Sequence, residues 1–192
     1  MATQPLPFPY LSEAQFFAID ETVGVPSDYW DGAMYSMVAA SREHALIAVN
    51  VIAELAAKLE SGPCQVFANG LHVRLRDGAY VAPDLAVACS PKFEQSVGGS
   101  LLNPTAIIEI LSPSTADYDR GKKWEGYRLL PSLMHYCLIH QDKVHVERFD
   151  RHPGGMWMFS DLLEPDATLD LPAIGCGMPI EKIYRRVFEP SS

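Results

Sequence analysis

The sequence AYVAPDLAVAC occupies residues 79–89, and the sequence TAIIEILS occupies residues 105–112. The middle of each segment is apolar apart from one acid, Asp84 in the first and Glu109 in the second. Such runs are typical of strands in a sheet covered on both faces, where burying an ionised carboxylate is costly unless a partner offsets its charge. Two such exceptions in one chain favour a shared explanation, and a divalent cation that binds both carboxylates would supply one.

An ordinary structural explanation stays open for each acid taken alone. An acid in a strand most often lies at the end of the sheet or pairs with an arginine. Pro83 fits this explanation, because proline lacks a backbone N–H and marks strand ends, edges and bulges. Bulges also occur beside active sites, where they redirect a side chain. Pro83 therefore does not decide between the two explanations.

The segments on either side of these runs predict both helices and strands. A capping box at Ser12 and Gln15 predicts a short helix, and Asp31-Gly32 is typical of a hairpin turn. Ser41 caps the clearest helix, in which apolar residues recur at helical spacing until Gly62-Pro63 ends it. Further strands are predicted at residues 71–76, 80–89, 106–111, 135–140, 144–149, 156–159 and 169–174, and further helical segments at 118–130 and 180–184. The order predicts an α/β domain around a curved sheet.

The composition is that of an ordinary globular protein. The 192 residues carry 15 Lys and Arg against 24 Asp and Glu, a net charge of −9, and 48% of them are hydrophobic. We expect one domain over residues 1–192, with its core from about 10 to 185. No apolar run approaches the length of about 18 residues that spans a bilayer, and the N-terminus shows no secretory signal, so we expect a cytoplasmic protein without membrane contact. The acidic total excludes a general non-specific nucleic-acid binder, which is normally basic.

The charge is unevenly distributed along the chain. Residues 1–41 hold five acids and no Lys or Arg, and a second acidic group lies at residues 161–170. We expect both to face away from any nucleic acid. Residues 120–128 hold four basic residues against one acid, and with the strand face of His72, Arg74 and Arg76 they could contact backbone phosphates. A solvent-facing polar side is the alternative for that strand face.

The four cysteines form no CxxC pair. Metal frameworks need clustered ligands, and a free cysteine in an apolar segment behaves as a small buried side chain. We therefore expect Cys64, Cys89, Cys137 and Cys176 to form neither disulfides nor a zinc site.

A third segment with candidate catalytic residues is YDRGKKWEGY at residues 118–127. On a helix, Asp119, Lys123 and Tyr127 lie along one face, and Lys122 points about 100° away from it. A lysine directed at two metal-bound carboxylates can orient an attacking water or stabilise a phosphorane-like transition state, so Lys123 is the better candidate. The alternative is a solvated amphipathic helix with an Asp119–Lys123 ion pair.

The order of these motifs resembles a known family. The segments in question are YWDGAMYSM at 29–37, SREHALIAVN at 41–50, YVAPDLAV at 80–87, IEILSPST at 108–115, YDRGKKWEGY at 118–127 and PSLMHYCLI at 131–139. Together they resemble the Uma-two-type family of restriction endonucleases, within the PD-(D/E)XK nuclease superfamily. The resemblance covers roughly residues 10–185 and implies a restriction-endonuclease-like core, with a mixed curved central sheet flanked by helices and acids that bind Mg²⁺ or Mn²⁺.

The resemblance also implies roles for individual residues. Asp84 corresponds to the metal-binding Asp of the PD motif, and Glu109 to the D/E position, with the Ile110 carbonyl as a further ligand. The simplest superfamily pattern places a lysine two residues after that acid, where this chain has Leu111. The resemblance implies that Lys123, from the following helix, takes this catalytic role.

Supporting and DNA-contacting residues follow from the same motifs. Arg120 and Tyr127 are implied as supporting residues. Glu43 and His44 belong to the early motif, although Glu43 could simply favour the helix dipole and His44 could be a packed residue. The predicted DNA contacts are Arg74, Arg76, Lys122 and Arg128.

The expected reaction is the metal-dependent hydrolysis of phosphodiester bonds in DNA, with Asp84, Glu109 and Lys123 as catalytic residues. A homodimer would match the two-fold symmetry of a duplex. Two other functions stay open: an interaction or regulatory subunit that keeps a nuclease fold, and a metal-dependent hydrolase of RNA or nucleotides. The retained acids and lysine count against the first of these.

Overall fold

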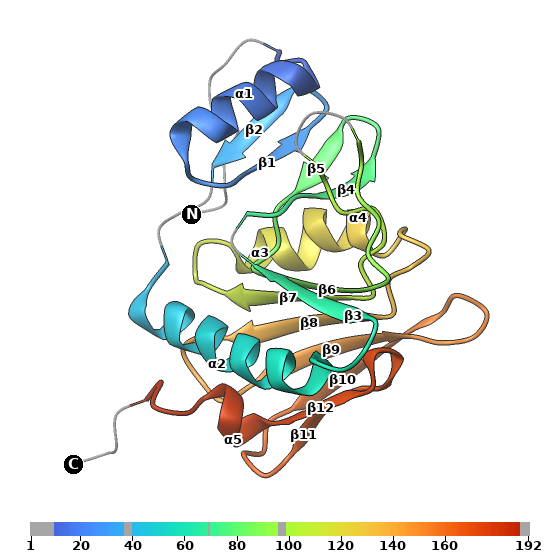
Figure 1. Cartoon of the computed structure of the whole chain (residues 1–192). Coiled ribbons are helices and arrows are strands. Elements are labelled where there is room, and N and C mark those ends of the chain that lie inside the picture. Colours follow the sequence, from blue (N-terminus) through green and yellow to red (C-terminus); the bar gives the residue numbers. More distant parts are fainter. Residues whose placement is uncertain (1–9, 37–39, 69, 96–98, 189–192) are drawn as a thin grey trace.

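A mixed six-stranded sheet forms the centre of the protein. The computed structural model describes residues 10–36, 40–68, 70–95 and 99–188 (Figure 1). The strand order is β10-β9-β8-β7-β6-β3, in which β7 and β8 are parallel and all other neighbours are antiparallel. The bounds are β3 Cys64–Ala68, β6 Leu85–Cys89, β7 Ala106–Leu111, β8 His135–His140, β9 Val146–Arg151 and β10 Trp157–Leu162. The predicted α/β class with a mixed sheet is confirmed.

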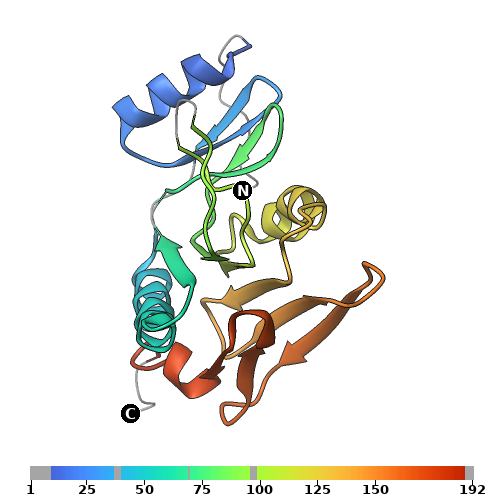
Figure 2. The same cartoon turned by 45° about the vertical axis from the view of Figure 1, so that its right-hand side comes forward.

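Helices cover both faces of this sheet (Figure 2). On one face, α2 (Arg42–Leu59) packs with α5 (Ile180–Ile183) and β12 (Cys176–Pro179), which pairs with β11 (Thr168–Leu171). On the other face lies a continuous helical segment made of α3 (Ala116–Tyr118), the π-helical turn η1 (Asp119–Lys123) and α4 (Trp124–Tyr127). Alternate residues of β7 divide between the two faces, so Ile108 and Ile110 join the α2 side and Ile107 joins the opposite side.

A smaller sheet lies at one end of the molecule (Figure 1). Its order is β2-β1-β5-β4, with β1 Ser27–Trp30, β2 Ala33–Ser36, β4 Val73–Arg76 and β5 Ala79–Val81, and α1 (Glu13–Val23) accompanies it. The predicted capping box of Ser12 and Gln15 is present, and Asp31-Gly32 turns the chain between β1 and β2. Met37, at the end of the hairpin motif, lies outside the described residues.

The prediction of one long strand over residues 80–89 is wrong. The chain leaves the smaller sheet at β5 and enters the larger sheet at β6, and residues 82–84 connect them. Pro83 has no N–H, and the N–H of Ala82 is donated to the Asp28 side chain instead of to a strand. The break places Asp84 at the junction of the two sheets.

Several smaller expectations need adjustment. The helix predicted over residues 118–130 starts earlier and has a π-helical turn at its centre. The strand predicted at 169–174 ends at Leu171, where the 3₁₀ turn η2 (Pro172–Ile174) begins, and β12 was not predicted. The helices predicted after Ser41 and at residues 180–184 are confirmed, as is the strand at 106–111. In the described part of the chain, no helix has the length and apolar character needed to cross a membrane.

The expectation of four free cysteines is wrong for two of them. Cys64 of β3 and Cys89 of β6 are direct cross-strand partners and form a disulfide. Their proximity comes from strand pairing between residues 25 apart in the chain, which a search for CxxC spacing does not detect. Cys137 and Cys176 are free and buried, as expected.

Gly126 in α4 tests how tightly the helical segment packs on the smaller sheet. A Cβ at Gly126 would lie 2.5 Å from Leu75 Cδ1 and 2.9 Å from Trp30 Cη2. We expect Gly126→Ala to lower the free energy of unfolding by about 1–3 kcal/mol, measured by urea denaturation. The matched control is Gly121→Ala, where a Cβ meets no atom within 4 Å. It should leave stability unchanged or raise it by up to about 1 kcal/mol, and equal losses in both variants would contradict the packing.

Candidate active site

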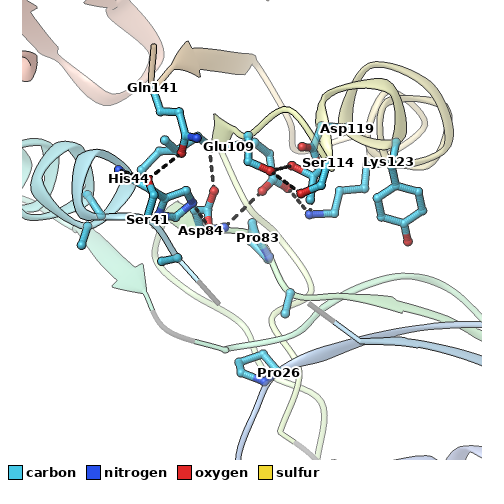
Figure 3. Close-up of a pocket in the computed structure, with 18 of the residues that line it drawn as sticks. Pro26, Ser41, His44, Pro83, Asp84, Glu109, Ser114, Asp119, Lys123 and Gln141 are labelled. Atoms are coloured by element: carbon cyan, nitrogen blue, oxygen red, sulfur yellow. Dashed lines mark hydrogen bonds and ion pairs between the residues drawn. The ribbon is translucent and has the colours of Figure 1, made fainter. Parts of the chain in front are cut away.

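A cavity of about 620 Å³ lies where α2, the 82–84 connection, β7 and the helical segment meet. Its walls include the predicted residues Asp84, Glu109, Ile110, His44 and Lys123. Figure 3 shows His44, Asp84, Glu109 and Lys123 directed toward the same region from four separate parts of the chain. The structure therefore brings together the predicted catalytic acids, the lysine and one of the two early-motif residues.

Asp84 and Glu109 are held together by a reciprocal pair of hydrogen bonds. The backbone N–H of Asp84 donates to Glu109 Oε2 at 3.2 Å, and the N–H of Ile110 donates to Asp84 Oδ2 at 2.7 Å. The first bond is available because Asp84 precedes the start of β6, so its N–H has no strand partner. Each carboxylate is thus fixed by the backbone that carries the other, which limits how far the two can separate.

Lys123 is buried against Glu109. Its Nζ donates to Glu109 Oε1 at 3.0 Å and lies 3.2 Å from Asp119 Oδ1, and only 4% of the lysine is exposed. Tyr127 also donates its hydroxyl to Glu109 Oε1, at 3.0 Å. Asp119, Lys123 and Tyr127 therefore share one face, as predicted, although η1 is a π-helical turn. Such turns occur frequently at functional sites.

His44 contacts the other carboxylate. Its Nε2 lies 3.2 Å from Asp84 Oδ1. Burial raises the pKa of Asp84, but the hydrogen bond from His44 and the charges of His44 and Lys123 outweigh it, so the pKa lies below its usual range. Burial lowers the pKa of His44, but the bond to Asp84 and the Asp84 charge outweigh this, so its pKa is raised. Asp84 is thus held as a carboxylate.

Two further acids line the cavity, Asp28 and Asp119. Asp28 is 1% exposed and accepts hydrogen bonds from the N–H of Ala82 and the hydroxyl of Tyr118, both at 2.8 Å. The Tyr118 hydroxyl in turn accepts one from Trp30 Nε1 at 2.7 Å. Asp28 belongs to the acidic segment 1–41, which was expected to face away from any nucleic acid, and the structure places it in the wall of the cavity that holds Asp84 and Glu109. The sequence gave no signal for Asp28, because it lies in a short hairpin strand and does not interrupt a long apolar run as Asp84 does.

The cavity therefore carries more carboxylates than cations. Burial raises the pKa of Glu109 well above its usual range, and Asp119 and Asp84 add to this while Lys123 opposes it. Burial lowers the pKa of Lys123, but the charges of the carboxylates around it outweigh this effect and raise that pKa well above its usual range. Both shifts reflect the surplus of acids, which keeps Lys123 charged and, together with burial, disfavours ionisation of Glu109. A site with this balance attracts cations.

The chain matches one known protein family over most of its length. The Uma2 family, described as "Putative restriction endonuclease", matches residues 14–181. The chain belongs to the Uma2 family. This confirms the resemblance seen in the sequence motifs, and the family description together with the fold supports a nuclease-like function.

Proteins of two organisms are similar to this chain. The Synechocystis protein slr1290 is 30% identical over 180 residues, covering 93% of this chain and 94% of its own. A second protein of that organism, sll1609, is 25% identical over 162 residues, covering 83% and 92%. The crystal structure of "a putative nuclease belonging to DUF820" from Anabaena variabilis has a TM-score of 0.68 with this chain at 18% identity, covering 88% of this chain and 98% of that one. This last likeness shows the shared fold.

Two of the predicted supporting residues lie away from the Uma2 cavity. Glu43 is on the first turn of α2 and pairs with Arg42, at 3.7 Å. Arg120 forms a bidentate pair with Glu147, and its Nη2 lies 3.1 Å from His140 Nε2. Arg120 thereby fastens η1 to β8 and β9, which is a supporting role in the fold rather than a contact with the acids.

The four predicted DNA contacts do not line the cavity. Arg74 pairs with Glu94 and Asp77, and Arg76 pairs with Asp31. Lys122 donates to the Tyr35 hydroxyl at 2.9 Å and lies over that ring.

The strand face that was to carry two of these contacts also differs from expectation. His72 is buried and contacts the Ser27 carbonyl, so it shares no solvent-facing side with Arg74 and Arg76. Arg128, the fourth predicted contact, is exposed just after α4. Contact of Arg74, Arg76, Lys122 and Arg128 with DNA stays a prediction.

Proposed function

We propose that this Uma2 protein is a metal-dependent endonuclease that hydrolyses phosphodiester bonds in DNA. The observation that carries the proposal is the pair of the half-buried Asp84 and the buried Glu109. Hydrogen bonds to the backbone hold these two carboxylates together in the cavity wall, and Lys123 lies beside them. These three residues are the ones that the sequence motifs nominated for catalysis. The Uma2 description and the nuclease neighbour support the same class of reaction.

The donor set fits a hard divalent cation. Mg²⁺ and Mn²⁺ prefer carboxylate and carbonyl oxygens, and Asp84, Glu109 and the Ile110 carbonyl would hold such an ion. A bound cation would also offset the charge of the surplus carboxylates that line the cavity. When bound, the cation would act as a Lewis acid that offsets phosphate charge and makes water a better nucleophile at neutral pH.

The residues of the chain supply the remaining requirements. Lys123 keeps its proton, because the charges of the surrounding carboxylates outweigh the effect of burial and raise its pKa, so it donates hydrogen bonds and does not act as a base. It can orient the attacking water and stabilise the charge that develops on the pentacoordinate phosphorus. The Tyr127 hydroxyl holds Glu109 in position, and Asp119 holds Lys123. His44 does the same for Asp84.

Several parts of this proposal go beyond the family relationship. The identity of the ion, the DNA substrate, a homodimeric assembly and a cytoplasmic location stay predictions. A homodimer would allow two centres to act on the two strands of a duplex.

A substrate screen tests the proposed reaction. The purified protein should cut plasmid or single-stranded DNA when Mg²⁺ or Mn²⁺ is added, and should leave both intact in EDTA. Calorimetry should detect Mn²⁺ binding by the natural protein and none by the Asp84→Asn/Glu109→Gln variant, because both carboxylate ligands are then neutral. Cleavage of RNA alone would assign a different substrate. Mn²⁺ binding with no cleavage of any substrate would contradict the enzymatic function and favour a regulatory subunit.

A further inference from the structure

The cavity extends beyond the catalytic acids along an apolar strip of α2. The strip consists of Ala45, Ala48, Val49 and Ile52, which follow the i, i+3, i+4, i+7 spacing of one helix face. Val49 is 63% exposed, although the buried side of α2 is completed by Ile47, Val51 and Leu55. The helix therefore presents four apolar side chains to the cavity, of which Ala45 and Val49 are exposed while Ala48 and Ile52 are half-buried against the core.

The opposite wall at this end is also apolar. Val25 and Pro26, which precede β1, line the cavity together with Pro83. In Figure 3, Pro26 lies on the far side of Pro83 from Gln141, with Asp84 between Gln141 and Pro26. The cavity thus runs from a polar end at Ser41 and Gln141, past the acids, to an apolar end between α2 and the segment before β1.

The distribution of charge limits what the apolar end can bind. Among the described residues that line the cavity, Lys123 is the only Lys or Arg, and it is already paired with Glu109 and Asp119. A run of backbone phosphates needs Lys or Arg contacts, which this wall does not offer. An uncharged planar group is compatible with it. The volume of about 620 Å³ is in the range of small-molecule sites and is far below that needed to enclose a base-paired duplex.

We propose that the apolar end binds the unpaired base of the nucleotide next to the scissile phosphate. This inference rests on the proposed function, because it takes the acids and Lys123 as the place where the phosphate lies. It names the substrate class as single-stranded or locally unpaired nucleic acid. A base held against Ala48 and Val49 would be out of its stack, as enzymes that enclose a nucleotide require.

Calorimetry with two small ligands tests the base site without any cleavage assay. Thymidine 5′-monophosphate and 2-deoxyribose 5-phosphate share the phosphate and sugar and differ in the base. In the presence of Mn²⁺, we expect the nucleotide to bind at least about tenfold more tightly than the sugar phosphate, because the apolar surface of the base is removed from water. Equal affinities would overturn the base site and leave the proposed nuclease function standing. Failure of both ligands to bind would overturn the base site together with the placement of the phosphate.

Two leucine variants on α2 test whether the apolar strip of this helix is responsible for the tighter binding of the nucleotide. Ala48→Leu narrows the apolar end and should abolish the tenfold preference while leaving binding of the sugar phosphate unchanged. Ala53→Leu places the same side chain on an exposed position of α2 outside the cavity and should change neither affinity. A preference that survives Ala48→Leu would show that the base lies elsewhere. A circular-dichroism melt of each variant confirms that it is folded.

Substrates with one abasic nucleotide extend the test to the reaction itself. We expect single-stranded DNA to be cut at least about tenfold faster than a matched duplex, because the duplex must first be unpaired. Removing the single base next to the scissile phosphate should lower the rate of the single strand, and removing a base several nucleotides away should not. A duplex cut as fast as the single strand would overturn the inference.

Discussion

Replacement of Asp84 by asparagine is expected to reduce cation-dependent cleavage of DNA by about 10³-fold or more. The substitution keeps the size of the side chain and an oxygen that can accept the Ile110 N–H, which is now 2.7 Å from Asp84 Oδ2. It removes the negative charge of Asp84, which His44 and Lys123 stabilise; this stabilisation is what lowers the pKa of Asp84. The measurement is the initial rate of plasmid nicking in Mn²⁺, together with Mn²⁺ affinity by calorimetry.

The control for this substitution is Asp77→Asn. Asp77 lies in the turn between β4 and β5 with 93% of its side chain exposed, and it does not line the cavity. The Asp77→Asn protein should cleave DNA at the rate of the natural protein. Asp84→Asn should lose no more than about 1 kcal/mol of stability, because the backbone bond is kept. An Asp84→Asn protein that cuts DNA at the natural rate would remove this residue from the catalytic site.

Replacement of Lys123 by methionine is expected to have the largest effect on stability. It leaves the buried carboxylates Glu109 and Asp119 without their cation, and loss of one partner of a buried pair lowers the free energy of unfolding by about 3–5 kcal/mol. The measurement is urea denaturation in EDTA. Adding Glu109→Gln to Lys123→Met should recover part of the loss, because one of the unpaired charges is then removed.

Lys122→Met is the neighbouring control. Lys122 contacts the Tyr35 hydroxyl and lies over the Tyr35 and Trp30 rings, and its side chain has no buried carboxylate partner among the described contacts. Its replacement should lower stability by no more than about 1 kcal/mol. If Lys123→Met were as mild as Lys122→Met, the buried charge network described here would be refuted.

The parts of the fold predicted well from sequence are those with a strong local signal. The strand at 106–111 is buried on both faces, so its sequence is a continuous apolar run with clear ends. The long helix carries its own cap at Ser41 and an apolar period. The long strand at 80–89 was predicted wrongly, because the apolar pattern continues across Pro83 while the hydrogen-bond partners change from one sheet to the other.

The residues of the candidate site also differ in how well the sequence predicted them. Asp84 and Glu109 stood out because charged residues interrupt apolar strands, and Lys123 followed from helical spacing. Asp28 did not stand out, since its burial depends on the distant partners Ala82 and Tyr118. Arg120 was predicted as a supporting residue, and its partner Glu147 lies on β9, a contact between the helical segment and a distant strand that cannot be read from the helix sequence alone.

The contact of Asp28 with the 82–84 connection links the candidate active site to the smaller sheet. Asp28 lies on β1 of the four-stranded sheet, yet it accepts the Ala82 N–H two residues before Asp84 and the hydroxyl of Tyr118 at the start of the helical segment. Local opening of that sheet would release the loop bearing Asp84 while the six-stranded sheet stayed intact. The upper temperature of activity would then lie below the global melting temperature. Substitutions that raise heat tolerance are therefore to be sought in residues 10–36 and 73–81.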